Sequence, residues 1–145
     1  KLENAGLWGS ETDLIFYQEG ADGGALKVAS GKNIHLQIKV KTKLLSNYID
    51  RKVNFLKLDI EGAEVEVIKE IQNKLHFVDR IFVEYHSFID TNQEIHELLR
   101  ILSNAGFRLH INTPGLSSIQ PFVYLNTYNN MDMQLNIYGV KPNIK

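Results

Sequence analysis

Three acidic side chains, Asp59, Glu61 and Glu64, gather at the end of an apolar stretch of the chain, residues 53–60. The stretch is rich in branched and aromatic residues, which predicts a buried parallel strand, and Gly62 permits a tight turn into a following helix. In open α/β sheets, ligands bind at the carboxyl ends of the strands. Carboxylates placed there can accept hydrogen bonds from a ligand, hold a cation or take up a proton.

A structural role is the alternative for these acids. Glu64 is expected in the first turn of the helix, where the helix dipole favours negative charge, so dipole complementarity explains it as well as ligand binding does. Asp59 and Glu61 crowd the edge of the sheet where ligands are expected, which favours a functional role for that pair.

Glu84 and His86 end the next predicted strand and point to the same side of it. If the two strands are neighbours, both side chains face the same crevice as Asp59. A histidine there can act as a general base near neutral pH, although a strand-end histidine is more often an ordinary hydrogen-bonding residue. The group could also hold a hard cation, but its residues show no established ligand spacing, so no metal site is predicted.

Lys57 shares a face of the predicted strand with Asp59. Burial of an unpaired ammonium group is costly, so this lysine must reach a carboxylate, extend to water or face a site. A structural ion pair and a contact with substrate remain equally open for Lys57.

Strands alternate with helices after residue 53, and this alternation predicts an α/β fold with a largely parallel sheet. The first third of the chain is predicted to form a separate β segment with a flexible glycine-rich loop at residues 20–24. Thr91 or Asn92 is expected to cap the second helix, and Gly106 to end it. The expected strands are residues 2–8, 14–17, 35–41, 53–60, 80–85, 107–111 and 133–140, and the expected helices are residues 44–49, 63–75 and 91–105.

The bulk composition limits the possible functions. A chain of 145 residues suits one domain, and its net charge of −1 gives no electrostatic case for binding nucleic acid or an anionic membrane. The absence of cysteine excludes disulfides and thiolate metal sites and fits a reducing, cytoplasmic location. No apolar run approaches the length of a membrane span.

Residues 55–64 (FLKLDIEGAE) resemble the hallmark segment of FkbM-type methyltransferases, and residues 82–88 (FVEYHSF), 5–8 (AGLW) and 131–138 (MDMQLNIY) are similar to other parts of that family. The resemblance implies a partial Rossmann-like methyltransferase sheet, mostly parallel, with a late antiparallel strand. It also implies transfer of a methyl group from S-adenosylmethionine to a hydroxyl of a sugar, glycan or related metabolite.

The resemblance suggests a role for each candidate residue. Asp59 would lie beside the methyl-transfer centre, with Asp59 and His86 as the catalytic residues. Asp59, Glu61 and Glu64 would bind the cofactor, and Glu84 and His86 would border the acceptor pocket. The family motif assigns no role to Lys57, whose predicted contact with substrate rests on its strand face alone. Taken together, the predicted sites are Asp59 and His86 for catalysis, Glu84 and Lys57 for substrate, and Asp59, Glu61 and Glu64 for cofactor.

The chain departs from the family in one respect, because it contains neither the glycine-rich cofactor loop of the first family strand nor the acid that follows the second. Residues 1–145 are therefore expected to be one methyltransferase-like domain that is a fragment of a longer protein. A non-catalytic α/β binding or assembly module is the alternative. Without a preceding strand, residues 53–60 would expose an apolar edge, which predicts self-association or cover by the N-terminal β segment.

Overall fold

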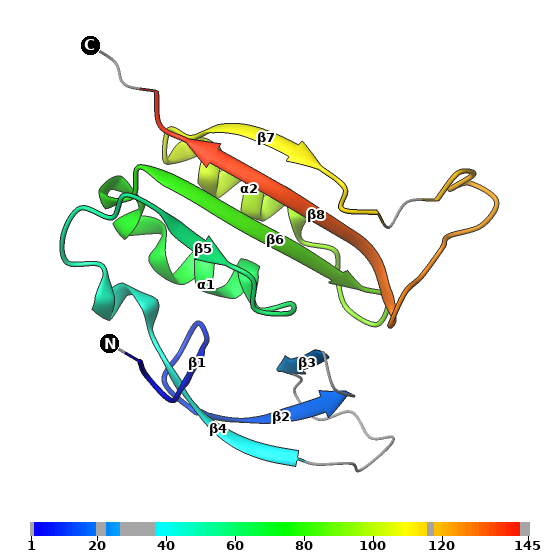
Figure 1. Cartoon of the computed structure of the whole chain (residues 1–145), viewed down its shortest axis with the longest axis horizontal. Coiled ribbons are helices and arrows are strands. Elements are labelled where there is room, and N and C mark those ends of the chain that lie inside the picture. The colour runs from blue at the N-terminus through cyan, green and yellow to red at the C-terminus, as the bar shows by residue number, and fades with distance from the viewer. Residues whose placement is uncertain (1, 20–22, 27–36, 116–117, 143–145) are drawn as a thin grey trace.

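Two four-stranded sheets form the framework of the protein, as the computed structural model in Figure 1 shows. The structure describes residues 2–19, 23–26, 37–115 and 118–142. The N-terminal sheet has the strand order β1-β4-β2-β3, and the C-terminal sheet has the order β5-β6-β8-β7. None of the described helices is both long enough and apolar enough to cross a lipid bilayer.

The C-terminal sheet consists of β5 (Leu56–Leu58), β6 (Arg80–Phe88), β8 (Met131–Val140) and β7 (Arg108–Asn112). Strands β5 and β6 are parallel, whereas β8 runs antiparallel to both of its neighbours. The α/β class and the late antiparallel strand are confirmed, but the expectation of a mostly parallel sheet is wrong. The chain returns from β7 and inserts β8 between β6 and β7, so two of the three pairings become antiparallel.

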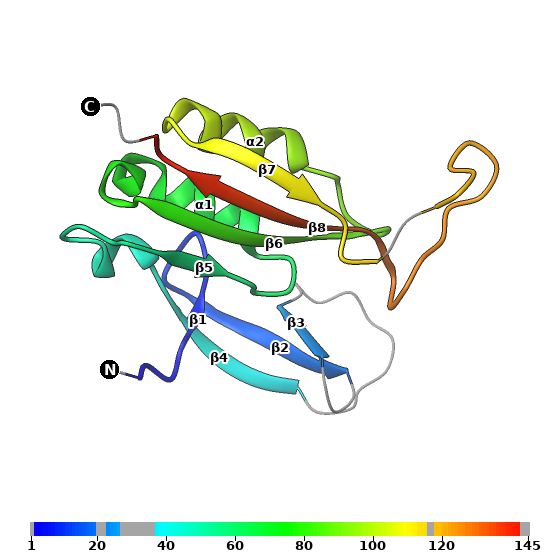
Figure 2. The same ribbon diagram turned by 45° about the horizontal axis from the view of Figure 1, so that its top comes forward.

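Helices α1 (Glu64–Ile71) and α2 (Ile95–Asn104) lie on one face of the C-terminal sheet, and no helix of the described residues covers the other face (Figures 1 and 2). The predicted helix at residues 63–75 is confirmed, although it tightens into a 3-10 helix, η2 (Gln72–Phe77), after α1. The core lies between helices and sheet. It includes these buried side chains: Leu58, Val67, Ile68, Ile71, Leu75, Ile81, Val83, Leu98, Leu102 and Ile137.

Strand β6 shows how the sequence separates the two faces of this sheet. Ile81, Val83 and Tyr85 are buried on the face that the helices cover, while Phe82 and Glu84 are partly exposed. Each aliphatic side chain that is fully buried in this way contributes about 1.5–3 kcal/mol to folding. The period of two along β6 therefore directs apolar residues to the core and leaves Glu84 accessible.

The N-terminal sheet contains β1 (Gly6–Leu7), β2 (Asp13–Glu19), β3 (Gly23–Leu26) and β4 (Gln37–Lys43), followed by a 3-10 helix, η1 (Leu45–Tyr48). Gly23 and Gly24, predicted to be part of a flexible loop, instead begin β3 and pair with β2, because glycine tolerates the extended backbone of an edge strand. The rest of that loop, residues 20–22, and residues 35 and 36 of the predicted strand at 35–41 lie outside the described residues.

Helix α2 begins at Ile95, later than predicted, and neither Thr91 nor Asn92 caps it. Thr91 is used elsewhere, since its hydroxyl donates a hydrogen bond to the Phe88 carbonyl and closes the turn after β6. The Glu94 backbone N–H at the start of the helix donates to the Tyr85 hydroxyl at 3.2 Å. At the other end, Gly106 has a φ of 87° and ends the helix as predicted.

Strand β5 is an edge of the C-terminal sheet and is shorter than the predicted strand at residues 53–60. Val53 makes only an isolated bridge with Val78, and the ladder starts at Leu56. Among the described residues β5 pairs with β6 alone, and no ladder joins β5 to the N-terminal sheet. Phe55, beside this edge, is 58% exposed.

We expect the protein to self-associate through the β5 edge, because unpaired strand edges favour pairing with another chain. A Phe55→Lys substitution places a charge beside the edge and should convert the associated species to monomer. Size-exclusion chromatography with light scattering over a range of concentrations measures the change in mass. Tyr48→Lys, at an exposed position in η1, is the matched control and should associate like the parent protein. A parent protein that stays monomeric at every concentration contradicts this expectation.

Candidate active site

The connection between β5 and α1 is a left-handed turn at two consecutive residues. Glu61 has a φ of 54° and Gly62 a φ of 99°. A Cβ atom at Gly62 would lie 2.8 Å from Cε2 of Phe88, so only glycine fits there. Glu61 has a Cβ atom, unlike glycine, so its left-handed backbone conformation carries a strain of roughly 1–2 kcal/mol. Surrounding contacts must hold it, and backbone strain of this kind is concentrated at functional sites.

The Glu64 carboxylate supplies those contacts. It accepts hydrogen bonds from the backbone N–H groups of Ile60 and Gly62, each at 3.1 Å, and its own side chain is 1% exposed. The residue stands in the first turn of α1, where the helix dipole favours a negative group. The structural role that the sequence left open for Glu64 is therefore present, and a direct contact with cofactor remains a prediction.

The same carboxylate orients His86, which sits near the carboxyl end of β6. Nδ1 of His86 lies 3.1 Å from Oε1 of Glu64, and Nε2 lies 3.8 Å from Oε2 of Glu61 and 3.7 Å from Oε1 of Glu84. The imidazole is 2% exposed. It is thus fixed on one side by a buried partner and turned on the other side toward two further acids.

This environment shifts two pKa values. Burial alone would lower the pKa of His86, but the hydrogen bond to Glu64 and the negative charges of Glu64, Glu61 and Glu84 outweigh it, so the net pKa is raised. Burial also raises the pKa of Glu61, although His86 opposes this and the neighbouring acids add to it. A histidine and a carboxyl group with raised pKa values in one place are typical of sites that transfer protons or hold charged ligands.

Lys57 and Asp59 form an ion pair at the outer side of the group. Nζ of Lys57 lies 3.0 Å from Oδ2 of Asp59 and 5.9 Å from the centre of the Phe82 ring. Both side chains are accessible, with 56% exposure for Lys57 and 32% for Asp59. The hydrogen bond to Asp59 raises the pKa of Lys57. The ion-pair interpretation of Lys57 is confirmed, and its contact with substrate remains a prediction.

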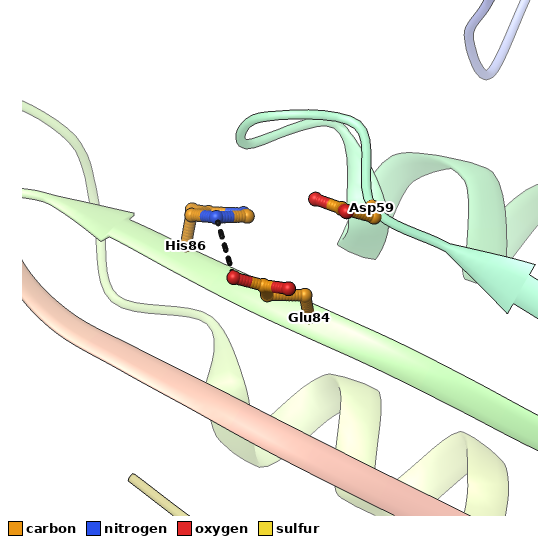
Figure 3. Close-up of side chains that lie close together, drawn as sticks. All are labelled: Asp59, Glu84 and His86. Carbon is orange, nitrogen blue, oxygen red and sulfur yellow. Dashed lines mark ion pairs between the residues drawn. The ribbon is translucent and has the colours of Figure 1, made fainter. Parts of the chain in front are cut away.

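Asp59, Glu84 and His86 converge, as Figure 3 shows. One ligand atom from each residue lies within 4.8 Å of the others. Because β5 and β6 are parallel neighbours, with Leu58 opposite Val83, the residues that follow Leu58 lie beside the residues that follow Val83 within β6. The predicted proximity of the acids after β5 to Glu84 and His86 is therefore found in the structure.

Two contributors to the site come from distant parts of the chain and were not predicted. Gln134 on β8 donates a hydrogen bond to Oε1 of Glu84, because it lies opposite His86 in the ladder. Trp8, which follows β1, lines a pocket of about 390 Å³ beside His86. Only the pairing order and the placement of the N-terminal sheet reveal these contacts, so the linear sequence carried no signal for them.

The pocket lies where α1 begins and β6 ends. It combines aromatic and acidic walls with the strained turn, and its volume falls in the range of small-molecule sites, about 300–1,000 Å³. Lining residues include Trp8, Glu61, Gly62, Tyr85, His86 and Phe88. The site therefore offers a concave surface next to a cluster of proton-accepting groups.

Comparison with known proteins gives two similarities. The family model described as "Methyltransferase FkbM domain" matches residues 5–109. The "Hexuronic acid methyltransferase AglP" of Haloferax volcanii is 30% identical over 101 residues, which cover 69% of this chain and 41% of that protein. No solved structure matches significantly. The matched region contains the turn and the ends of β5 and β6.

The Glu64 carboxylate should be essential for stability. Glu64→Ala leaves two backbone N–H groups and an imidazole without their acceptor, and we expect the free energy of unfolding to fall by about 3–5 kcal/mol. Glu64→Gln keeps one acceptor oxygen and should lose less. Urea denaturation measures both. Glu66→Ala, which removes a partly exposed acid paired with Lys69, is the control and should change stability by less than about 1 kcal/mol.

The strain at Glu61 predicts an unusual effect of glycine. Glu61→Gly should be more stable than Glu61→Ala by about 1 kcal/mol, because glycine adopts a positive φ without cost while alanine does not. The same pair of substitutions at Glu66, inside α1, should give the opposite order, since glycine weakens helices by about 1 kcal/mol relative to alanine. Equal stabilities of the two Glu61 variants would show that the turn is not strained in solution.

Proposed function

Because the chain belongs to the FkbM methyltransferase family, we propose that it forms part of the active site of an S-adenosylmethionine-dependent O-methyltransferase. The observation that carries the proposal is the convergence of Asp59, Glu84 and His86 at the carboxyl ends of β5 and β6, beside a pocket. That edge is the ligand edge of α/β sheets. The similarity to the Haloferax protein covers 41% of its length, so the activity of a whole enzyme is part of the proposal.

The arrangement of the C-terminal sheet is compatible with part of a Rossmann-like methyltransferase sheet. Strands β5 and β6 form a parallel pair connected through α1, and β8 is reversed beside β6. These features support the finer assignment within the broader α/β class. The family resemblance, rather than the pairing pattern by itself, supplies the methyltransferase identity.

The pocket suits a cofactor with an aromatic base, ribose hydroxyls and a positive sulfonium. Trp8 and Phe88 offer aromatic surfaces, and Glu61 offers a carboxylate that can accept hydrogen bonds or face a cation. Glu64 would contribute by holding the turn that presents Glu61. When bound, S-adenosylmethionine supplies an activated methyl group.

The chain's own residues would position the acceptor and receive its proton. Asp59 is accessible, and its carboxylate can accept a hydrogen bond from the hydroxyl of the acceptor. This hydrogen bond would orient the hydroxyl oxygen, and the carboxylate would then take up the hydroxyl proton. His86 is buried under the acids, and Glu64 fixes its ring, so His86 is a second candidate base for a hydroxyl that enters the pocket. Glu84 and Lys57, on the face without helices, would contact the rest of the acceptor.

The proposed acceptor is a hydroxyl of a sugar, glycan or related metabolite. The printed name of the Haloferax relative specifies a hexuronic acid, which supports this class for the present chain. Lys57 offers the positive charge that a sugar carboxylate requires, and Asp59 and Glu84 offer acceptors for sugar hydroxyls. A neutral sugar would need only Asp59 and Glu84, which accept hydrogen bonds from its hydroxyls.

Asp59→Asn should lower kcat by about 10²-fold or more, because a positioned base contributes about 10²–10⁴-fold to rate. Transfer of labelled methyl from S-adenosylmethionine to a panel of sugars and hexuronic acids measures it. Asp79→Asn is the matched control, because Asp79 pairs with Lys52 at 3.0 Å as Asp59 does with Lys57.

Calorimetry with S-adenosylmethionine separates the two functional classes. Binding with turnover supports the enzyme, whereas neither binding nor turnover by the whole protein supports a non-catalytic module. Turnover by Asp59→Asn at the parent rate removes Asp59 from the mechanism and leaves His86 as the base to test.

A further inference from the structure

We propose that Asp59, Glu84 and His86 form a binding site for a divalent transition-metal cation. The sequence predicted no metal because the spacing of these residues along the chain matches no established ligand pattern. In the folded chain, however, β5 and β6 bring two carboxylates and an imidazole to one point (Figure 3).

The separations fit a cation after a small movement of side chains. The three ligand atoms lie within 4.8 Å of one another. Metal–ligand bonds of about 2.0–2.2 Å place opposite ligands about 4–4.4 Å apart and adjacent ones closer. A rotation of the accessible Asp59 side chain closes the difference without movement of either strand.

His86 is prepared for this role by its second partner. Glu64 holds Nδ1, so the remaining nitrogen, Nε2, is directed toward the acids, and it makes no hydrogen bond within the described part of the chain. The imidazole side chain as a whole is 2% exposed, and His86 lines the pocket. A carboxylate that fixes the far nitrogen of a histidine is the usual arrangement around a metal-binding imidazole, because it sets the ring orientation and raises ligand basicity.

The negative charges around the imidazole also favour the binding of a cation. Carboxylates surround it on several sides, and they belong to Asp59, Glu61, Glu64 and Glu84. Among the described residues, Lys57 is the cationic side chain in contact with this group, through Asp59. Its ammonium is largely exposed and can withdraw to solvent, which frees Asp59 Oδ2 for a metal.

The ligand set selects the kind of metal. The imidazole nitrogen favours Zn²⁺ over Mg²⁺ or Ca²⁺, which prefer oxygen ligands alone, and the two carboxylates also suit Mn²⁺. Asp59 is 32% exposed, so positions on the cation would remain open to water or to a ligand hydroxyl. The metal-site proposal can be tested independently of methyl transfer, because metal binding is measured without cofactor, acceptor or turnover.

The test is titration of the chelator-treated protein with Mn²⁺, with free Mn²⁺ followed by electron paramagnetic resonance. We expect one strong site per chain. Asp59→Asn, Glu84→Gln and His86→Gln should each weaken binding at least tenfold, and Glu64→Gln, a change to the positioning residue, about 10–100-fold. Asp79→Asn removes the same charge elsewhere and should bind like the parent protein.

A second measurement identifies the ligand atom. On addition of Zn²⁺, the ¹⁵N resonance of His86 Nε2 should shift, while the Nδ1 resonance keeps the features of its hydrogen bond to Glu64. Asp59→Asn alters an accessible side chain, and its circular dichroism should confirm an intact fold, so its loss of affinity is decisive even if the His86 variant unfolds. Lys57→Met should tighten Mn²⁺ binding severalfold by removing the competing ammonium.

Three results would overturn the site: no Mn²⁺ binding at millimolar concentration, parent-like affinity in the Asp59 and Glu84 variants, or coordination through Nδ1. Failure of methyl transfer with intact Mn²⁺ binding would reject the proposed function and leave the metal site standing. Methyl transfer that persists in chelator, with no Mn²⁺ binding, would reject the metal site and support the proposed function.

Discussion

The Glu64 carboxylate is the interaction on which the site depends. It joins the backbone of the turn after β5 to the imidazole on β6, two segments far apart in the sequence. It holds the backbone on both sides of Glu61, which has a left-handed conformation, and it fixes Nδ1 of His86 so that Nε2 is directed toward the acids. One buried side chain thereby connects the turn that carries Glu61 to the imidazole of His86 beside the pocket.

Local features of the fold follow from the sequence with good accuracy. The apolar run before Asp59, the glycine at position 62 and the apolar stripe of α1 each act over a few residues, and the structure retains them. Strand pairing is different, because it depends on where a late segment returns. The alternation in β8 predicts a strand but does not indicate insertion between β6 and β7. Likewise, the sequence does not show which group the hydroxyl of Thr91 contacts. In the structure it donates to the Phe88 carbonyl in the turn after β6 and does not cap α2.

The candidate site divides in the same way. Parallel pairing of β5 with β6 sufficed to predict that Asp59 and Glu61 would meet Glu84 and His86. The buried position of Glu64 was not predictable, since a first-turn acid is usually exposed and the sequence does not show which way it points. Gln134 and Trp8 approach from other strands and become neighbours only once both sheets are placed.

The placement of both helices on one face of the C-terminal sheet has a consequence for recognition. Along β6, Ile81 and Val83 secure the core, while Phe82 and Glu84 face away from it. Substitutions at the outward positions can therefore alter what the protein recognises, whereas substitutions at the inward positions disturb the packing of the core. Along this one strand, the inward side chains maintain the core, and the alternating outward side chains are available for recognition.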